Sequence, residues 1–252
     1  MKKTLSTTIF FLLVASFAVA QSIYKDARTG ITISFITDAE MYPESWRGGA
    51  IKGEATSLAE TEYERSKSIV NNALNKYPVE VLTEHIKKVY VLDEIRFYGL
   101  RYGGTNSLDA VYISNRGLNS GYTDRYVEQL FHAEFSSILL RNLSYHLNQT
   151  TWEACNDESF TYGGSGMEAI KNKKAGEDFD PDFHRLGLLN QYASSNFEND
   201  VNSFAKNIFN PKPGFWDAID QYPRLQCKIQ LIISFYSQID PSFNEEYFKK
   251  WK

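Results

Sequence analysis

Hydrophobic and polar positions divide the first third of the chain into recognisable segments. Residues 30–35 alternate apolar and polar side chains, which predicts an early strand. Residues 37–57 are mixed in character and are expected to be loop. From about residue 58 to 77, apolar residues recur three and four positions apart, which predicts an amphipathic helix. Pro78 ends that helix, and a short second helix is expected over 79–86.

The pattern then changes to short strands and afterwards to helices. Strand-like runs are expected at 89–92, 95–100 and 110–114. A long helix is predicted over about 123–145, followed by a loose segment over 148–185 that is rich in glycine and charge. Further helices are expected at about 198–209, 215–219 and 225–236. Because strands and helices are segregated along the chain, the order predicts an α+β fold.

We expect residues 21–252 to form one domain. Its sheet-bearing part would cover about 21–146 and its mostly helical part about 147–252.

The N-terminus carries the pattern of a cleavable signal peptide. The basic segment Met1–Lys3 precedes an apolar stretch from Ile9 to Val19, and Ala18–Ala20 follows the small-x-small rule of a cleavage site. The apolar stretch is shorter than the roughly 20 residues that cross a bilayer. We therefore expect residues 1–20 to be removed, leaving a soluble, periplasmic or secreted chain that begins at Gln21 and has no integral membrane segment.

Charge and cysteine content narrow the possible partners. The signal segment holds two of the 27 basic residues and none of the 31 acidic ones, which leaves a net charge of −6 with neutral histidines. That balance argues against nucleic acid as a partner. Cys155 and Cys227 could form a disulfide in an oxidising compartment, but the sequence alone does not decide this.

A carboxylate falls on the apolar face of the predicted long helix. At 3.6 residues per turn, Glu134 lies on the same side as Leu130 and Ile138. Burying an ionised carboxylate is costly unless it has partners. Glu134 is therefore expected to be satisfied by a tyrosine, an arginine or backbone groups, or else to serve a metal or catalytic site.

The residues around Glu134 also carry a family resemblance. The run from about Ser68 to Asn142 resembles the zincin metallopeptidases, which place a helix, a small mixed sheet and then an active-site helix bearing His-Glu-x-x-His. Most of the chain is similar to a group of exported zinc metallopeptidase-like proteins found chiefly among Bacteroidetes. The matching features are Tyr77-Pro78, Tyr102-Gly103-Gly104, Phe131-His132-Ala133-Glu134-Phe135-Ser136-Ser137, Tyr192-Ala193 with Glu198 and Asp200, Phe235-Tyr236 and Asp240-Pro241.

The resemblance implies a zincin-like fold with an incomplete active-site motif. Zinc would be held by two histidines at i and i+4, with the intervening glutamate as general base. With Glu134 in the place of that general base, Ala133 and Ser137 stand where the histidines belong. Shifting the register so that His132 becomes the first ligand leaves Ala133 and Ser136 in the other two places.

The third zinc ligand would come from a later helix. The stretch Tyr192–Asp200 resembles the family's third-ligand region, with Glu198 as the matching position and Asp200 as the second choice. A competing interpretation is that Ser195 and Glu198 form a capping box at the start of the helix.

These features predict an exported zincin-like metallopeptidase homologue whose zinc-dependent activity is weakened or lost. Zinc is possible as a cofactor, but its absence is favoured. The alternative is a non-catalytic protein that binds a peptide or protein in its cleft. Two further possibilities are a rebuilt metal site using His132, Glu134 and Glu198, and an unrelated exported binding protein whose resemblance to the family is accidental.

Overall fold

The computed structural model describes residues 21–251, so the predicted signal peptide at 1–20 lies outside the described part of the chain. The strands form one mixed sheet with the order β1-β2-β4-β7-β6, and β3 and β5 pair with β4 beyond that path. The β2–β4 and β4–β7 pairs are parallel and the other pairs are antiparallel. The strands are β1 (Ile23–Lys25), β2 (Thr32–Ser34), β3 (Glu54–Ser57), β4 (Lys88–Phe97), β5 (Leu100–Tyr102), β6 (Gly104–Asn106) and β7 (Ala110–Ser114).

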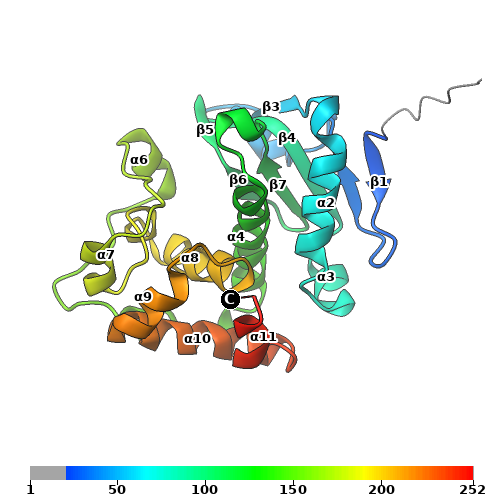
Figure 1. Ribbon diagram of the computed structural model, residues 1–252. Helices are drawn as coiled ribbons and strands as arrows, with labels where there is room; N and C mark the ends of the chain where they lie inside the picture. The colour runs from blue at the N-terminus through cyan, green and yellow to red at the C-terminus, as the bar shows by residue number, and fades with distance from the viewer. Residues whose placement is uncertain (1–20, 252) are drawn as a thin grey trace, which may run out of the picture.

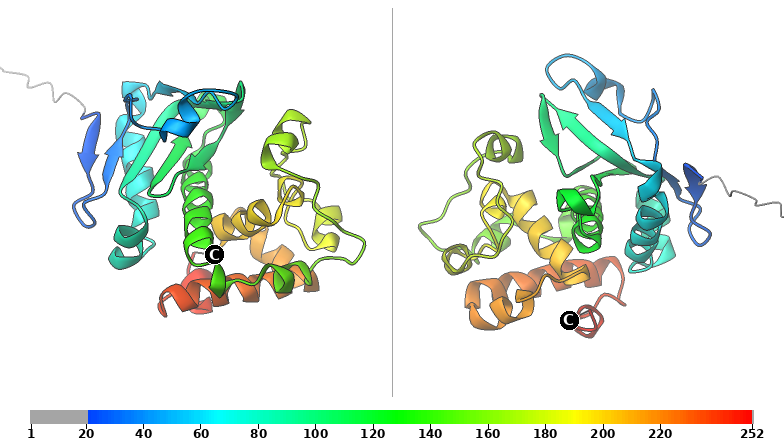
Figure 2. Two further views of the ribbon diagram at one scale, coloured as in Figure 1. Left: turned by 180° about the vertical axis from the view of Figure 1, so that it is seen from behind. Right: turned by 45° about the horizontal axis from the view of Figure 1, so that its top comes forward.

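The helices fall into two groups around the long helix α4 (Asp124–Asn142), which stands between the sheet and the C-terminal helices (Figure 1). Before it come α1 (Glu44–Arg47), α2 (Tyr63–Leu74) and α3 (Val79–His85). After it come α5 (Gln149–Glu153), α6 (Gly166–Lys171), α7 (Pro181–Leu186), α8 (Phe197–Phe209), α9 (Phe215–Gln221), α10 (Pro223–Ile239) and α11 (Glu245–Lys249). All the strands of residues 21–251 precede α4 and join one mixed sheet, and only helices follow α4 (Figure 2), which confirms the predicted α+β class. No helix within residues 21–251 is long and apolar enough to cross a membrane.

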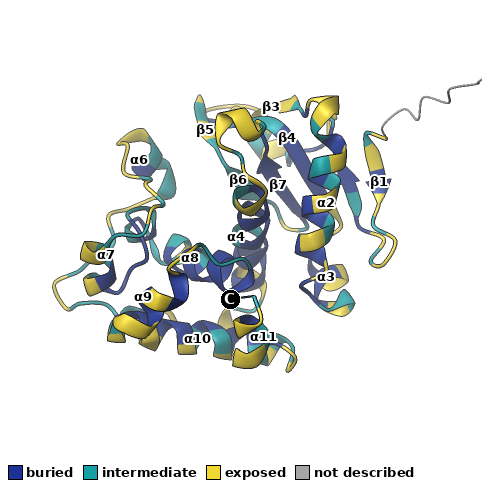
Figure 3. Cartoon of the chain, viewed as in Figure 1, coloured by how far each residue is buried: buried dark blue, intermediate teal, exposed yellow. Residues whose placement is uncertain are grey.

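Helix α4 is the central element of the fold. The Thr123 side chain accepts a hydrogen bond from the Tyr126 N–H and so caps its first turn. Most of its residues are buried, because the sheet and α2 cover one side and α8 packs along another (Figure 3). One continuous apolar core therefore joins the sheet to the C-terminal helices through α4.

The predicted pair of strands at 89–92 and 95–100 is wrong, because β4 runs unbroken from Lys88 to Phe97. The acidic residues in its middle stay in the strand because Glu94 pairs there with Arg96 and Arg101. The loop expected over 37–57 is wrong in two places. Helix α1 forms within it, and at its end β3 pairs with β4 through a bulge between Thr56 and Ser57.

The open question of the cysteines is settled by the structure. Cys155 and Cys227 form a disulfide with their Cα atoms 5.8 Å apart. The bond links the second residue after α5 to the second turn of α10, across 72 positions of sequence. It therefore fastens the irregular segment that follows α4 to the C-terminal helices.

Candidate functional site

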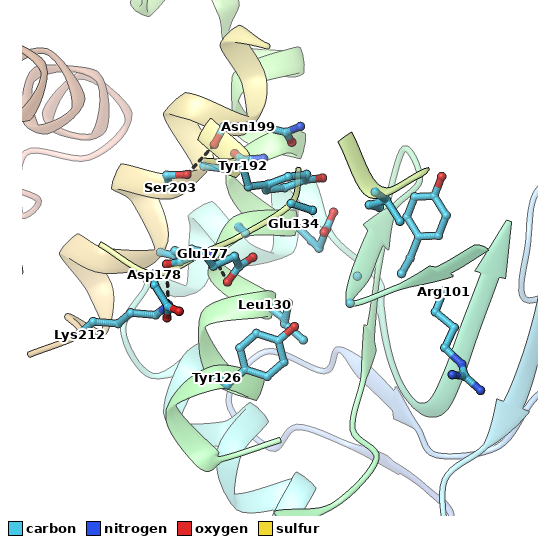
Figure 4. A pocket seen from close by; sticks show the side chains of 18 residues that line it. Arg101, Tyr126, Leu130, Glu134, Glu177, Asp178, Tyr192, Asn199, Ser203 and Lys212 are labelled. Carbon is cyan, nitrogen blue, oxygen red and sulfur yellow. Dashed lines mark hydrogen bonds and ion pairs between the residues drawn. The ribbon is translucent and has the colours of Figure 1, made fainter. Parts of the chain in front are cut away.

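A cavity of about 560 Å³ opens between the β5–β6 edge of the sheet, the side of α4 that bears Ala133 and Glu134, and α8 from Asn199 to Lys206. The segment over 170–178 and Lys212 close its remaining side. Figure 4 shows Glu134 and Glu177 on this cavity, with Tyr126 and Tyr192 beside them. Acidic, basic and aromatic side chains from distant parts of the sequence therefore share one space.

Glu134 lies where α4 faces the edge strand β6. The Asn106 amide donates a 2.8 Å hydrogen bond to Glu134 Oε2, and Arg141 holds that amide in place by donating to Asn106 Oδ1 over 3.0 Å. Gly104 leaves room for the carboxyl, because a Cβ there would lie 2.7 Å from Glu134 Oε1. The partner is therefore an asparagine amide, which was not among the tyrosine, arginine and backbone partners expected from the sequence.

The environment of Glu134 favours its protonated form. Burial raises the pKa of the carboxyl to about 7, and the nearby charge of Glu198 acts in the same direction. The Asn106 hydrogen bond and the charges of Lys206 and Arg141 oppose that rise. Near neutral pH the group therefore exists in both forms, as a carboxylic acid that can donate and a carboxylate that can accept.

The positions that would hold zinc carry non-ligating side chains. Ala133 lines the cavity beside Glu134, and Ser137 is buried one turn further along α4. Asn202 of α8 also lines the cavity and donates a 2.7 Å hydrogen bond from Nδ2 to Ser137 Oγ. Asn202, which the sequence analysis missed, is therefore the α8 residue that reaches the helical i, i+4 pair.

Glu198 occupies a different place on α8. It is exposed in the first turn and does not line the cavity, although its charge contributes to the raised pKa of Glu134. The capping box predicted at Ser195 is wrong, because the cap is Asn196, whose side chain accepts from the Asn199 N–H over 2.8 Å. Ser195 instead donates to the Tyr192 carbonyl.

Asp200, the second choice for the third ligand, faces the core. It forms a fully buried ion pair with Lys228 and accepts hydrogen bonds from Trp152 Nε1 and the Tyr162 hydroxyl. The contacts with Trp152 of α5 and Lys228 of α10 hold α8 against these two helices.

His132 points away from the cavity and into the core. Its ring is fully buried, with Nδ1 2.9 Å from the Tyr77 hydroxyl and Nε2 3.2 Å from Glu128 Oε1, and it stacks on Phe209 at 5.0 Å. Burial lowers its pKa to about 4. Both nitrogens are engaged, and the structure does not bring His132 together with Glu134 and Glu198. Nowhere in the described part of the chain do three His, Cys, Asp or Glu side chains gather as a metal-binding group.

A second charged group lines the cavity opposite α4. Lys206 of α8 pairs with the Glu177 carboxylate at 2.8 Å, and Lys212 donates to the Glu177 carbonyl oxygen over 3.1 Å. The Lys206 ammonium holds the pKa of Glu177 below its usual value, against the opposing effect of burial. No sequence pattern connects these positions, because Glu177 lies in an irregular segment.

The edge strand β6 presents free backbone groups. The Ser114 N–H donates to the Gly103 carbonyl and the Ser107 N–H donates to the Ala110 carbonyl. Since hydrogen-bonded and non-hydrogen-bonded pairs alternate in an antiparallel ladder, Thr105 pairs with Tyr112, while Gly104 and Asn106 direct their N–H and C=O groups outward. Within residues 21–251 these outward groups have no hydrogen-bond partner.

Comparison of the chain with known protein families, with curated proteins and with solved structures found no match.

Proposed function

We propose that this chain is a zincin-like protein that binds an extended peptide in the cleft between β6 and α4 and does not hydrolyse it with zinc. The observation that carries the proposal is the contact between Ser137 and Asn202, which fills the place of a metal with a hydrogen bond between neutral side chains. Glu134 remains beside it in the position of the family's general base.

The side chains at the three positions do not fit a zinc ion. A catalytic zinc needs three nitrogen, sulfur or carboxylate ligands and one open position for water. Ala133 offers no donor atom, and neither the Ser137 hydroxyl nor the Asn202 amide matches that ligand set. Glu134 alone supplies too few ligands to hold the ion against water.

The cleft retains features that suit a peptide backbone. An extended peptide can join a sheet by bonding to unpaired groups of its edge strand, which gives affinity through main-chain hydrogen bonds. The outward groups of Gly104 and Asn106 offer that edge. Tyr126, Leu130 and Tyr192 supply apolar surface for alternate side chains of the peptide.

Hydrogen exchange at individual amides tests this binding mode. Adding an extended peptide ligand should slow exchange at the Gly104 and Asn106 amides. The Thr105 amide, already paired with Tyr112, should change little and serves as the internal control. Binding that leaves Gly104 and Asn106 unprotected would refute strand addition at β6.

A parallel assay separates binding from hydrolysis. The purified protein is incubated with the same peptides with and without added zinc, and products are followed by mass spectrometry. We expect intact peptide in both cases. Cleavage that depends on zinc and disappears in Glu134→Gln would show that the chain is an active peptidase.

A further inference from the structure

Lys212 is presented to the cavity by a rigid segment. It stands between Pro211 and Pro213, whose rings restrict the backbone on both sides. Its own N–H donates to Asn207 Oδ1 over 3.1 Å, and Gln129 of α4 donates to the carbonyl of the neighbouring Asn210 over 2.6 Å. The lysine backbone is therefore fixed from both α8 and α4.

The Lys212 ammonium is half-buried and has few protein partners. Its one hydrogen bond goes to the Glu177 carbonyl oxygen, and it forms no ion pair with any carboxylate in residues 21–251. The Glu177 carboxylate is engaged by Lys206, while the exposed Asp178 contributes attraction without an ion pair. An ammonium has three N–H donors, so at least two remain for a ligand.

Burial and a neighbouring lysine both act against the charged form of Lys212. Burial lowers the pKa of the Lys212 ammonium, and the charge of Lys206 lowers it further. Glu177 and Asp178 oppose that effect. A negative group placed beside Lys212 would offset both the loss of water and the repulsion between the two lysines.

We propose that Lys212 is a carboxylate subsite of the peptide cleft, which takes either an acidic side chain or the free C-terminus of the bound peptide. The inference rests on the proposed function, because it assumes that a peptide enters from the β6 side. Lys212 lines the same cavity as Gly104 and Glu134, on the side opposite Arg101 (Figure 4), so one extended ligand can contact all of them.

Matched peptides distinguish the two sources of the carboxylate. Four versions of one extended peptide combine Glu or Gln at a single position with a free or an amidated C-terminus. Their affinities are measured by isothermal titration calorimetry on the wild-type protein, Lys212→Met and Lys212→Arg. Lys174→Met removes an exposed lysine outside the cavity and is the matched control.

We expect the wild-type protein to prefer one carboxylate-bearing version by about tenfold, as a charge-assisted hydrogen bond would give. Lys212→Met should lose this preference, Lys212→Arg should keep part of it, and Lys174→Met should keep all of it. If Lys212→Met binds all four versions with the same preference as the wild-type protein, the subsite is overturned, while the proposed peptide binding in the cleft still stands.

A small probe keeps the subsite testable if no peptide binds. N-acetylglycine, with N-acetylglycinamide as the uncharged control, is titrated while the ¹³Cε signal of Lys212 is followed, assigned by its absence in Lys212→Met. A saturable shift with the acid alone supports the subsite even where peptide binding fails. No shift, together with no peptide binding, rejects the subsite and the proposed function together.

Discussion

Asn202 on α8 donates a 2.7 Å hydrogen bond to Ser137 Oγ on α4, although 65 positions separate the two residues in sequence. In a zinc site of the expected type, the side chains at such facing positions would both point at the metal. Here they bond to each other, and Asn202 lines the same cavity as Glu134 while Ser137 is buried behind it. Under the function proposed above, the three ligand positions of the family would correspond to Ala133, Ser137 and Asn202.

This geometry predicts which substitutions would create a zinc site. The triple variant Ala133→His, Ser137→His and Asn202→Glu should bind one zinc ion per chain after dialysis, because it supplies two imidazoles and a carboxylate on facing helices. The wild-type protein should retain none. Inductively coupled plasma mass spectrometry gives the ratio of zinc to protein.

The double variant Ala133→His/Ser137→His is the matched control for Asn202. If Asn202 is the third position, the double variant should bind zinc much more weakly than the triple variant, and adding Glu198→Gln to it should change nothing. A double variant that holds zinc as tightly as the triple, and loses it with Glu198→Gln, would return the third position to Glu198.

The sequence could not predict which residue of α8, Glu198 or Asn202, reaches α4. The i, i+4 spacing of Ala133 and Ser137 follows from helix geometry and can be read from the sequence. Glu198 and Asn202 are also four apart, so they share a side of α8 but differ by about 6 Å along its axis. Which of them reaches α4 depends on how the two helices cross, and hydrophobic periodicity does not encode that. The contact between Asn106 and Glu134 could not be predicted either, because it depends on how the edge strand β6 packs against α4.

Glu134 should make stability fall as pH rises towards neutrality. Its pKa is raised to about 7 in the folded protein, so the protonated form stabilises the fold at low pH and this contribution is lost as pH rises through about 7. Glu134→Gln should remove that loss and raise stability at pH 8 by about 1–2 kcal/mol, less than the full shift implies, because the carboxyl is only half-buried beside an open cavity.

Urea unfolding between pH 4.5 and 8 measures this effect, with Glu158→Gln as the control on an exposed carboxylate that does not influence Glu134. Parallel pH profiles for the wild-type protein and Glu134→Gln would contradict the raised pKa.

His132 should have the opposite pH dependence. Its pKa is lowered to about 4 by burial, so the neutral ring stabilises the fold above its ordinary pKa of 6.5, and this contribution is lost as pH falls from there towards 4. His132→Phe keeps the stacking on Phe209 but leaves the Tyr77 hydroxyl without its partner. The variant should be less stable by about 1–3 kcal/mol at pH 7.5.

The difference in stability between the wild-type protein and His132→Phe should shrink towards pH 5, because only the wild-type protein has a histidine at position 132 that can be protonated. Thermal unfolding at both pH values gives the comparison. A deficit that grows on acidification would mean that the buried ring is charged in the folded state.

The Cys155–Cys227 disulfide should contribute strongly to stability, because it closes a long loop around the irregular segment. The cross-link spans 72 positions and limits the freedom of the unfolded chain, for which a loop of this length predicts about 4 kcal/mol. Next to it, Trp152 and Lys228 meet at the buried Asp200, so loosening α5 from α10 also weakens a charge pair that has no access to water.

The double variant Cys155→Ala/Cys227→Ala should therefore lower the free energy of unfolding by at least that amount. The wild-type protein in reductant should fall to a similar value, while the variant should not respond to reductant at all. Equal stability of the wild-type protein with and without reductant, once mass spectrometry has shown the bond to be reduced, would mean that packing alone holds α5 against α10.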